Sequence, residues 1–377
     1  MNHVYFDFNA NTPVAPQAAA DMRPFIDEQF GNASATHWAG QRMRAAIERA
    51  RGDVAELLNA KPSEVVFTSG GTESNNMALG GILFGDHGKQ WPHLIVSRVE
   101  HPSILQVAAF WERLGGRVTQ VAVDSQGKVD PREVERAIQA DTVLISIMHA
   151  NNEVGTLQPI REIAAVARAR QVLVHTDAAQ SVGKVAVDVQ DLGVDLLTVA
   201  GHKMYAPAGV GVLYLREGVR LDPFLRGAGH ESGRRAGTEN TLEIVGLGAA
   251  SKVAHAWLQN PSIRDLRDYF WDELRGAFGD QVVLNGHPTD RLPNTLNVSF
   301  VGRKGREILA EIPELAASTG SACHAGQDHL SPVLKAMGIT ERVGLGAIRF
   351  SLGRSSTRDE IDWVVSRLRE VLSGRAA

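Results

Sequence analysis

Several polar motifs in this chain directly follow apolar runs, and their residue types could bind and activate a carbonyl compound that carries a phosphate. In TSGGTES, Gly71 and Thr72 precede an expected helix whose backbone N–H groups could hold a phosphate. His101 in VEHPS could stack on a flat ring, and Asp177 in HTDAAQ could pair with a protonated ring nitrogen. Lys203 in AGHKMYAPAG supplies an amine that could form a Schiff base with an aldehyde.

Each motif also has a structural interpretation. The glycines can form a tight turn with a threonine helix cap, and Asp177 can cap a helix. His101 and Lys203 can be ordinary loop residues, and the adjacent Asn151 and Asn152 are typical of a turn. A phosphate cradle, a stacking imidazole, a carboxylate and an amine nevertheless converge on one ligand, pyridoxal 5′-phosphate. No GxGxxG motif opens a βαβ unit and no His/Cys cluster has metal-ligand spacing, so a dinucleotide and a metal are disfavoured.

The elements that must position these residues alternate between strands and helices. Apolar runs rich in Val, Ile and Leu, each followed by a polar turn, predict strands within 64–74, 93–103, 141–155, 171–180 and 195–203. Helices are expected at 41–58 and 160–170. This alternation predicts a doubly wound, mostly parallel α/β sheet, whose strands place their carboxyl ends at one ligand-binding edge.

After about residue 250 the pattern changes to that of a smaller α+β unit. We expect a long helix at about 247–278, strands in QVVLNG and NTLNVSFVG, and a C-terminal helix capped by Thr357 and Glu360. The sequence thus predicts a large cofactor-binding domain over 13–250. A small C-terminal domain over 251–377 is expected to include 1–12 and to carry the cysteine loop.

The composition excludes several classes of protein. The chain has 377 residues, of which 44% are hydrophobic and 22% charged, the balance of an ordinary α/β protein. A net charge of −4 argues against a dedicated nucleic-acid binder. We expect no membrane span, because no apolar stretch approaches the necessary length, and the N-terminus does not resemble a signal peptide.

The chain contains one cysteine, Cys323, in STGSACHAGQ. A single cysteine cannot form an internal disulfide, so a reducing compartment, by default the cytoplasm, is expected. Cys323 can be a small buried residue or a reactive thiolate, and its polar, glycine-rich surroundings favour the thiolate.

Motifs along nearly the whole chain resemble those of the class V aminotransferase family of fold-type-I pyridoxal-phosphate enzymes, and within it the group of cysteine desulfurases and selenocysteine lyases. In chain order they are YFDFNANTP, FGNAS, FTSGGTESNN, EHPS, IMHANNEVGTLQPI, HTDAAQSVGK, GHKMYAPAGVG, RRAGTEN, RLPNTLNVSF, STGSACH and IRFSLGR. The resemblance implies a large PLP-binding domain with a smaller C-terminal domain, in a homodimer.

The resemblance also implies roles for individual residues. Lys203 would hold the cofactor and later abstract the Cα proton of the substrate, while Asp177 would pair with the ring nitrogen. The remaining residues expected at the cofactor are His101 on the ring, Gln180 at its phenolic oxygen, Gly71, Thr72 and His202 at the phosphate, and Thr238 at the phosphate in the partner subunit. Asn152 and Arg349 would bind the substrate carboxylate, for which an arginine fork is well suited.

By the same resemblance, Cys323 would take the sulfur of L-cysteine as a persulfide, leaving L-alanine, and would pass it to an acceptor protein. Selenocysteine lyase, acting on L-selenocysteine, is the alternative, because His324 and the GQDH after it are closer to that branch. Pro102 in EHPS argues against this alternative. A catalytically weak scaffold protein is disfavoured by the complete set of site residues. Two positions depart from the family pattern, Asn11 in place of threonine and Ala200 in place of a serine that helps to hold the phosphate.

Overall fold

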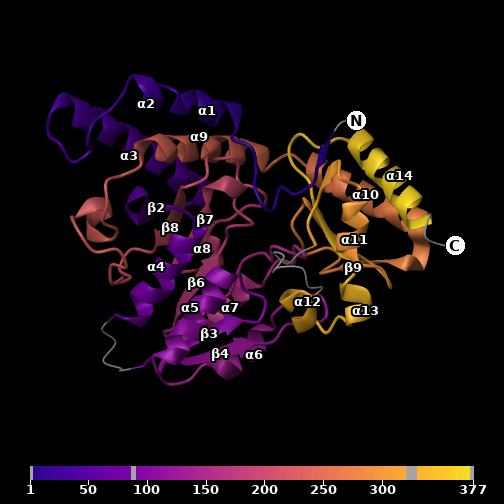
Figure 1. The fold of residues 1–377 in the computed structure, drawn as a ribbon. Coiled ribbons are helices and arrows are strands. Elements are labelled where there is room, and N and C mark those ends of the chain that lie inside the picture. The colour runs from indigo at the N-terminus through magenta and orange to yellow at the C-terminus, as the bar shows by residue number, and fades with distance from the viewer. Residues whose placement is uncertain (1–2, 86–90, 320–328, 374–377) are drawn as a thin grey trace.

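A seven-stranded sheet lies at the centre of the larger part of the molecule (Figure 1). The structure is a computed structural model, which describes residues 3–85, 91–319 and 329–373. The strands of this sheet are β2 (Val65–Thr68), β3 (His93–Ser97), β4 (Arg117–Val121), β5 (Thr142–Ser146), β6 (Leu173–Asp177), β7 (Leu196–Ala200) and β8 (Gly211–Leu215). Their order across the sheet is β2-β8-β7-β6-β5-β3-β4.

The five strands expected from the sequence are confirmed, and they all run in the same direction. Neighbours from β7 to β4 pair in parallel, whereas β8 is antiparallel to both β7 and β2. Because β2 and β7 both oppose β8, β2 is parallel to β7. The carboxyl ends of the expected strands therefore lie at one edge, as predicted.

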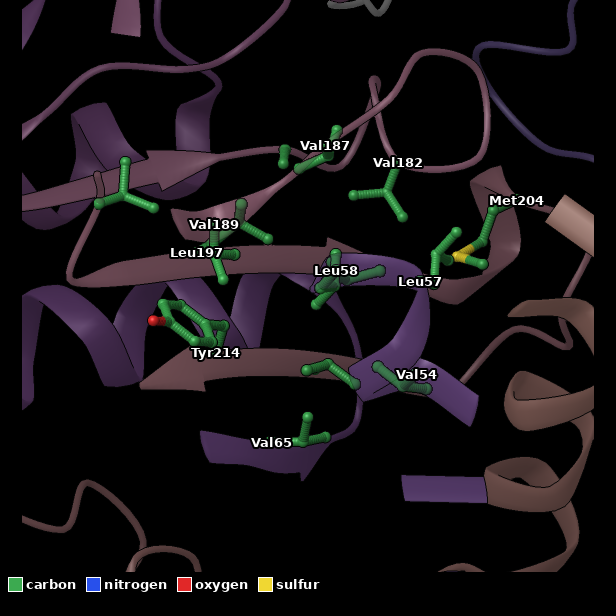
Figure 2. Close-up of a cluster of buried hydrophobic side chains, with 14 of the residues drawn as sticks. Val54, Leu57, Leu58, Val65, Val182, Val187, Val189, Leu197, Met204 and Tyr214 are labelled. Atoms are coloured by element: carbon green, nitrogen blue, oxygen red, sulfur yellow. The ribbon is translucent and has the colours of Figure 1, made fainter. Parts of the chain in front are cut away.

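Helices cover both faces of this sheet because alternate strand residues point to opposite sides. On β2, Val65 and Phe67 belong to the apolar core that includes α3 (Trp38–Leu58), α7 (Ile160–Ala169) and α9 (Thr241–Trp257). Figure 2 shows part of this core, where Leu58 of α3 lies beside Leu197 and Tyr214. Val66 points the other way, into the core formed with α4 (Gly71–Leu83) and α5 (Pro102–Arg113).

Shorter helices complete this part of the chain. They are α1 (Pro16–Met22), α2 (Pro24–Asp27), α6 (Pro131–Ala137) and α8 (Val189–Leu192). A 3₁₀ turn, η2 (Gly201–Lys203), follows β7 directly and carries the lysine that the sequence singled out.

The remaining elements surround an antiparallel sheet of order β12-β10-β9, drawn at the orange and yellow end of Figure 1. Its strands are β9 (Val282–Asn285), β10 (Thr295–Phe300) and β12 (Ala347–Ser351), and its core includes side chains of α10 (Ser262–Phe278) and α14 (Arg358–Ser373). The N-terminal strand β1 (Val4–Tyr5) joins this part through parallel pairing with β11 (Leu315–Ala316). The shorter helices here are α11 (Gly305–Ala310), α12 (Pro332–Ala336) and α13 (Glu341–Gly344).

The prediction of one long helix over 247–278 is wrong. The chain forms α9 and α10 with a break at 258–261, because Pro261 has no N–H to continue the hydrogen-bond ladder of α9. The predicted cap of the C-terminal helix is confirmed, since the N–H of Thr357 donates to Glu360 and the N–H of Glu360 donates to Thr357 Oγ1.

The proposed division into 13–250 and 251–377 with 1–12 stays a prediction. Residue 250 lies within α9, and both Ala250 and Ala254 belong to the core beside the seven-stranded sheet. Within the described residues, every helix is too short or too polar to cross a lipid bilayer.

Candidate active site

Five strand ends surround one cavity of about 400 Å³. The segments that follow β2, β3, β5, β6 and β7 each contribute side chains to its wall. Eight residues predicted at the site line the cavity, namely Gly71, Thr72, His101, Asn152, Asp177, Gln180, His202 and Lys203. The structure therefore brings together residues from five separate motifs of the sequence.

Three predicted site residues lie elsewhere. Thr238 is exposed and lines an adjoining hollow with Arg235 and Gly209. Arg349 is buried on β12 and connects to the cavity through Asn152. Cys323 and its neighbour His324 lie outside the described residues.

The turn between β2 and α4 leaves backbone N–H groups open to a ligand. Gly70 has a φ of +143°, and no heavy atom lies within 4 Å of the position that a Cβ would occupy there. Helix α4 begins at Gly71, two residues earlier than expected, and the first N–H groups of a helix have no acceptor within it. The neighbouring amide of Ser69 donates to Glu73, which Arg235 holds in an ion pair of 2.8 Å.

Asp177 is a buried carboxylate with partners on both oxygens. Its Oδ1 accepts from the N–H of Ala179 at 2.9 Å, and its Oδ2 accepts from Asn75 Nδ2 at 2.8 Å. The small side chains of Ala178 and Ala179 follow it directly. The carboxylate is fixed and keeps lone pairs free for one more donor, such as a protonated ring nitrogen.

Burial lowers the pKa of Lys203 below its ordinary value, because a desolvated ammonium is unfavourable. Asp177 opposes this shift and the positive charge of Arg349 adds to it. Burial likewise lowers the pKa of His101, with Asp177 opposing and Lys203 reinforcing the shift. The site thus shifts both Lys203 and His101 toward their neutral forms.

His101 begins helix α5, and its Nδ1 accepts hydrogen bonds from Ser103. The backbone N–H of Ser103 lies 3.2 Å from Nδ1, and the Ser103 hydroxyl oxygen lies 2.8 Å from it. Asn75 Nδ2 lies 2.8 Å from the same hydroxyl oxygen. A continuous chain of contacts therefore joins Asp177 to His101.

Gln180 is held by a second lysine that the sequence did not single out. Lys184 Nζ donates to Gln180 Oε1 at 2.9 Å and to Asn9 Oδ1 at 2.8 Å. Gln180 Nε2 donates to the Asn9 carbonyl at 3.0 Å, which turns its amide nitrogen away from Lys184. Burial lowers the pKa of Lys184 well below its ordinary value, and Lys203 reinforces this shift.

Arg349 makes two polar contacts that fix its guanidinium. Its Nη2 donates to Asp7 Oδ1 at 2.6 Å, and its Nη1 donates to the carbonyl oxygen of Asn152 at 2.8 Å. Its Nε is buried and has no hydrogen-bond partner among the described residues. Nε is therefore an unpaired donor covered by surrounding atoms, and Nη2 is occupied by a carboxylate of the protein itself.

These features fit pyridoxal 5′-phosphate. The open backbone at Gly70 and the free N–H groups of α4 suit a phosphate, since a side chain at Gly70 would fill that space. The buried Asp177 suits a pyridinium, and the amine of Lys203 suits an aldehyde.

Sequence reasoning missed Asp7, Asn75, Ser103 and Lys184. Each lies within a motif that the sequence displayed, but a motif does not say which side chains touch. Asn75 contacts partners 28 and 102 residues away, and only the packing of α4 against the sheet brings them together.

Comparison with known proteins agrees with this site. The family model for aminotransferase class-V matches residues 4–364, and the chain belongs to this family. Enzymes of this class depend on pyridoxal 5′-phosphate, which confirms the cofactor and the fold class expected from the sequence.

Among curated relatives, cysteine desulfurase IscS of Dictyoglomus turgidum (strain DSM 6724 / Z-1310) is 42% identical over 98% of this chain and 94% of its own. Cysteine desulfurase IscS of Methanosarcina thermophila is 43% identical over 98% and 92%. A solved NifS-like protein superimposes with a TM-score of 0.92 at 34% identity, covering 99% of this chain and 100% of the other. SspA in complex with cysteine superimposes at 0.81 with 37% identity, covering 92% and 98%.

Proposed function

We propose that this protein is a PLP-dependent cysteine desulfurase that converts L-cysteine to L-alanine and transfers the sulfur to Cys323. One observation carries the proposal: Lys203, with a lowered pKa, shares a cavity with Asp177 and His101. Full-length relatives named cysteine desulfurase support the choice of reaction within the family.

The residues around the cavity divide the work of holding the cofactor. Gly71, Thr72 and His202 are proposed to hold the phosphate, Asp177 the ring nitrogen and Gln180 the phenolic oxygen. When bound, pyridoxal phosphate supplies an aldehyde that captures amines and a ring that withdraws electrons from the substrate's Cα.

Lys203 is the proposed base. Its lowered pKa makes more of the neutral amine available near neutral pH, so that it can accept the Cα proton of the substrate. His101, beside it on the cavity wall, is proposed to cover the ring and to donate a hydrogen bond to the reacting atoms. The fixed carboxylate of Asp177 stabilises positive charge on the ring nitrogen.

Arg349 and Asn152 are proposed to bind the carboxylate of the substrate. The two residues are already joined by the hydrogen bond from Arg349 Nη1 to the Asn152 carbonyl. The guanidinium of Arg349, whose buried Nε has no hydrogen-bond partner among the described residues, is proposed to supply the charge-assisted hydrogen bond to that carboxylate.

Cys323 is the proposed sulfur acceptor, on the strength of the motif resemblance. Its thiolate attacks the substrate sulfur and the bond from that sulfur to Cβ breaks. The bonding electron pair stays with the three-carbon fragment, which is protonated to alanine, and the sulfur remains on Cys323 as a persulfide.

A homodimer, an acceptor protein for the sulfur and a cytoplasmic location belong to the same proposal. The exposed position of Thr238, outside its own cavity, supports its assignment to the partner subunit's phosphate. A chain with one cysteine forms no internal disulfide, which suits a reducing compartment.

The test supplies the PLP-loaded protein with L-cysteine or L-selenocysteine and measures alanine, sulfide and selenide. We expect alanine from L-cysteine, and a Cys323→Ser variant that binds the cofactor but forms no persulfide. A preference for L-selenocysteine by several orders of magnitude would instead identify a selenocysteine lyase. Absence of alanine from either substrate would refute the proposed reaction.

A further inference from the structure

The contacts between Asp177 and His101 favour one direction of hydrogen bonding, which the backbone of Ser103 then fixes. The Asp177 carboxylate can only accept, so the Asn75 atom 2.8 Å from Oδ2 must be the amide nitrogen. The second hydrogen of that nitrogen then points at the Ser103 hydroxyl oxygen, also 2.8 Å away. Because Ser103 Oγ accepts from Asn75, its own hydrogen is free for His101 Nδ1, 2.8 Å away.

The backbone adds an independent constraint on the same ring nitrogen. The N–H of Ser103 can only donate, and it points at His101 Nδ1 over 3.2 Å. A hydrogen on Nδ1 would face this N–H directly. Nδ1 therefore carries a lone pair, and in the neutral ring the proton sits on Nε2.

The surroundings of His101 keep the ring neutral. The ring caps the N-terminus of α5, where the positive end of the helix dipole disfavours an imidazolium. Two charged groups face it from other elements, the carboxylate of Asp177 at the end of β6 and the amine of Lys203 on η2. Asp177 favours the charged ring, while burial and Lys203 oppose it, and the net effect lowers the pKa of His101.

We propose that Asn75 and Ser103 are positioning residues that hold His101 as its Nε2–H tautomer, so that the imidazole presents a hydrogen-bond donor to the cavity. The inference rests on the proposed function for its role in catalysis. The hydrogen-bond chain through Asn75 and Ser103 supports both His101, the proposed stacking residue, and Asp177, the proposed partner of the ring nitrogen. The Nε2–H of the neutral ring is then a fixed hydrogen-bond donor, because a neutral imidazole does not release its second proton near neutral pH.

The orientation of Asn75 supports a role beyond stability. Its Oδ1 is buried and has no hydrogen-bond partner among the described residues, although its Nδ2 has two. A buried acceptor without a partner costs free energy of folding. Both N–H donors of the Asn75 amide therefore contact Asp177 and Ser103, while its Oδ1 has no hydrogen-bond partner among the described residues.

The tautomer can be read directly from the ring ¹⁵N shifts of histidine-labelled, PLP-loaded enzyme. The signals of His101 are assigned among those of 13 histidines as the ones missing in His101→Gln. From about pH 7 to about pH 9, above the ordinary histidine pKa of roughly 6.5, we expect an unprotonated Nδ1 and a protonated Nε2. A protonated Nδ1 in this range would overturn the proposal, and this measurement needs no variant of Asn75 or Ser103.

Two variants test the support itself. In Ser103→Ala the hydroxyl donor to Nδ1 is lost, and in Asn75→Ala the donor that orients the Ser103 hydroxyl is lost, so that the hydroxyl can rotate and accept from a protonated Nδ1. Both should raise the pKa of His101 and move the acidic limb of the pH–rate profile upward. Alanine formation at neutral pH should fall by about tenfold or more, since removing one preorganised hydrogen-bond donor from an active site costs roughly 10²–10³-fold.

Matched controls separate positioning from general disturbance. Ser103→Thr keeps the hydroxyl and should restore both the histidine pKa and the rate. Ser181→Ala removes a similar buried contact, Ser181 Oγ to His149 Nδ1 at 2.9 Å, and should leave the His101 signals unchanged. An unchanged His101 titration in both Ser103→Ala and Asn75→Ala would refute the support. If the tautomer is as expected but L-cysteine yields no alanine, the proposed function fails while the tautomer assignment stands.

Discussion

Asp7 and Arg349, 342 positions apart in the chain, are joined by a hydrogen bond of 2.6 Å between Oδ1 and Nη2. Arg349 is the residue proposed to bind the substrate carboxylate, so a carboxylate of the protein occupies part of the fork that the substrate needs. The contact also stabilises a buried cation that would otherwise have few partners. Asp7 therefore both holds Arg349 in place and competes with the substrate.

Replacing Asp7 with asparagine should strengthen substrate binding. The neutral amide keeps a hydrogen-bond acceptor but removes the competing charge, so KM for L-cysteine should fall by about threefold to tenfold with little change in kcat. Steady-state kinetics of alanine formation measure both constants. Asp27→Asn, which removes an exposed ion pair with Arg23, is the control and should change neither. A raised KM in Asp7→Asn would show that holding Arg349 outweighs the competition.

Replacing Lys203 with methionine should stabilise the cofactor-free protein and abolish the reaction. The pKa of Lys203 is lower in the folded than in the unfolded chain, so the unfolded state binds more protons between these two values. The stability of the native protein therefore rises with pH across this window. Lys203→Met should add roughly 1–2 kcal/mol to the free energy of unfolding near neutral pH, and less near pH 10.

Urea denaturation at the two pH values checks this expectation. Lys335→Met, at an exposed lysine of α12, is the control and should be nearly neutral. If Lys203→Met is no more stable than the native chain near neutral pH, burial of this amine does not penalise folding as we infer.

Replacing Glu100 with glutamine should remove a pH dependence of stability. Burial raises the pKa of Glu100 from its ordinary value of 4.5 to about 8, although hydrogen bonds from Ser97 and Met148 oppose the shift. Since the folded state holds this proton more tightly, the stability that it contributes is fully present below pH 4.5 and is lost as pH rises through 8. Glu100→Gln mimics the protonated acid at every pH.

Thermal unfolding at pH 5 and pH 9 tests the sign of this effect. The variant should match the native protein at the lower pH and exceed it at the higher pH, by on the order of a few kcal/mol. Equal stability of the two proteins at pH 9 would contradict a buried carboxyl with a raised pKa.

Replacing Ala200 with serine should tighten cofactor binding. Ala200 lines the cavity, and a Cβ placed on Gly71 would lie only 3.2 Å from the Cβ of Ala200. A hydroxyl there adds one donor at the proposed phosphate cradle, worth about 1 kcal/mol or roughly fivefold in the dissociation constant. Titration of the cofactor-free protein with pyridoxal phosphate measures this constant. Ala150→Ser, elsewhere on the cavity wall, should leave it unchanged.

The sequence predicts an element correctly where a single local pattern determines its structure. The apolar runs of β2, β3 and β7 are buried at every position and those of β5 and β6 at all but one, which is typical of central parallel strands, and the residues after them meet at one edge. Strand β4 was missed because it lies at the sheet edge with only Val121 buried, and so has no apolar run. The prediction of one long helix was wrong because it followed the apolar spacing of α9 and α10 and gave no weight to Pro261 between them.

The supporting residues of the site could not be predicted for a different reason. In the sequence Asn75 follows a glycine-rich turn and looks like an ordinary helix residue. Its contacts with Asp177 and Ser103 exist only because α4 packs against β6 and α5. Asp7 reads as part of a strand or turn until the N-terminus reaches β12. Such contacts depend on tertiary packing, which no spacing within a motif encodes.

The pairing of the N-terminal strand with the last part of the chain sets an order of events during biosynthesis. Strand β1 finds its partner only when residues 315–316 are available, and Asp7 finds Ser351 and Arg349 later still. At about 5–20 residues per second, a ribosome needs roughly 20–70 s to pass from Asp7 to Arg349, 342 residues later. The arginine proposed to bind the substrate therefore gains its carboxylate partner only after the 342 residues beyond Asp7 have been translated.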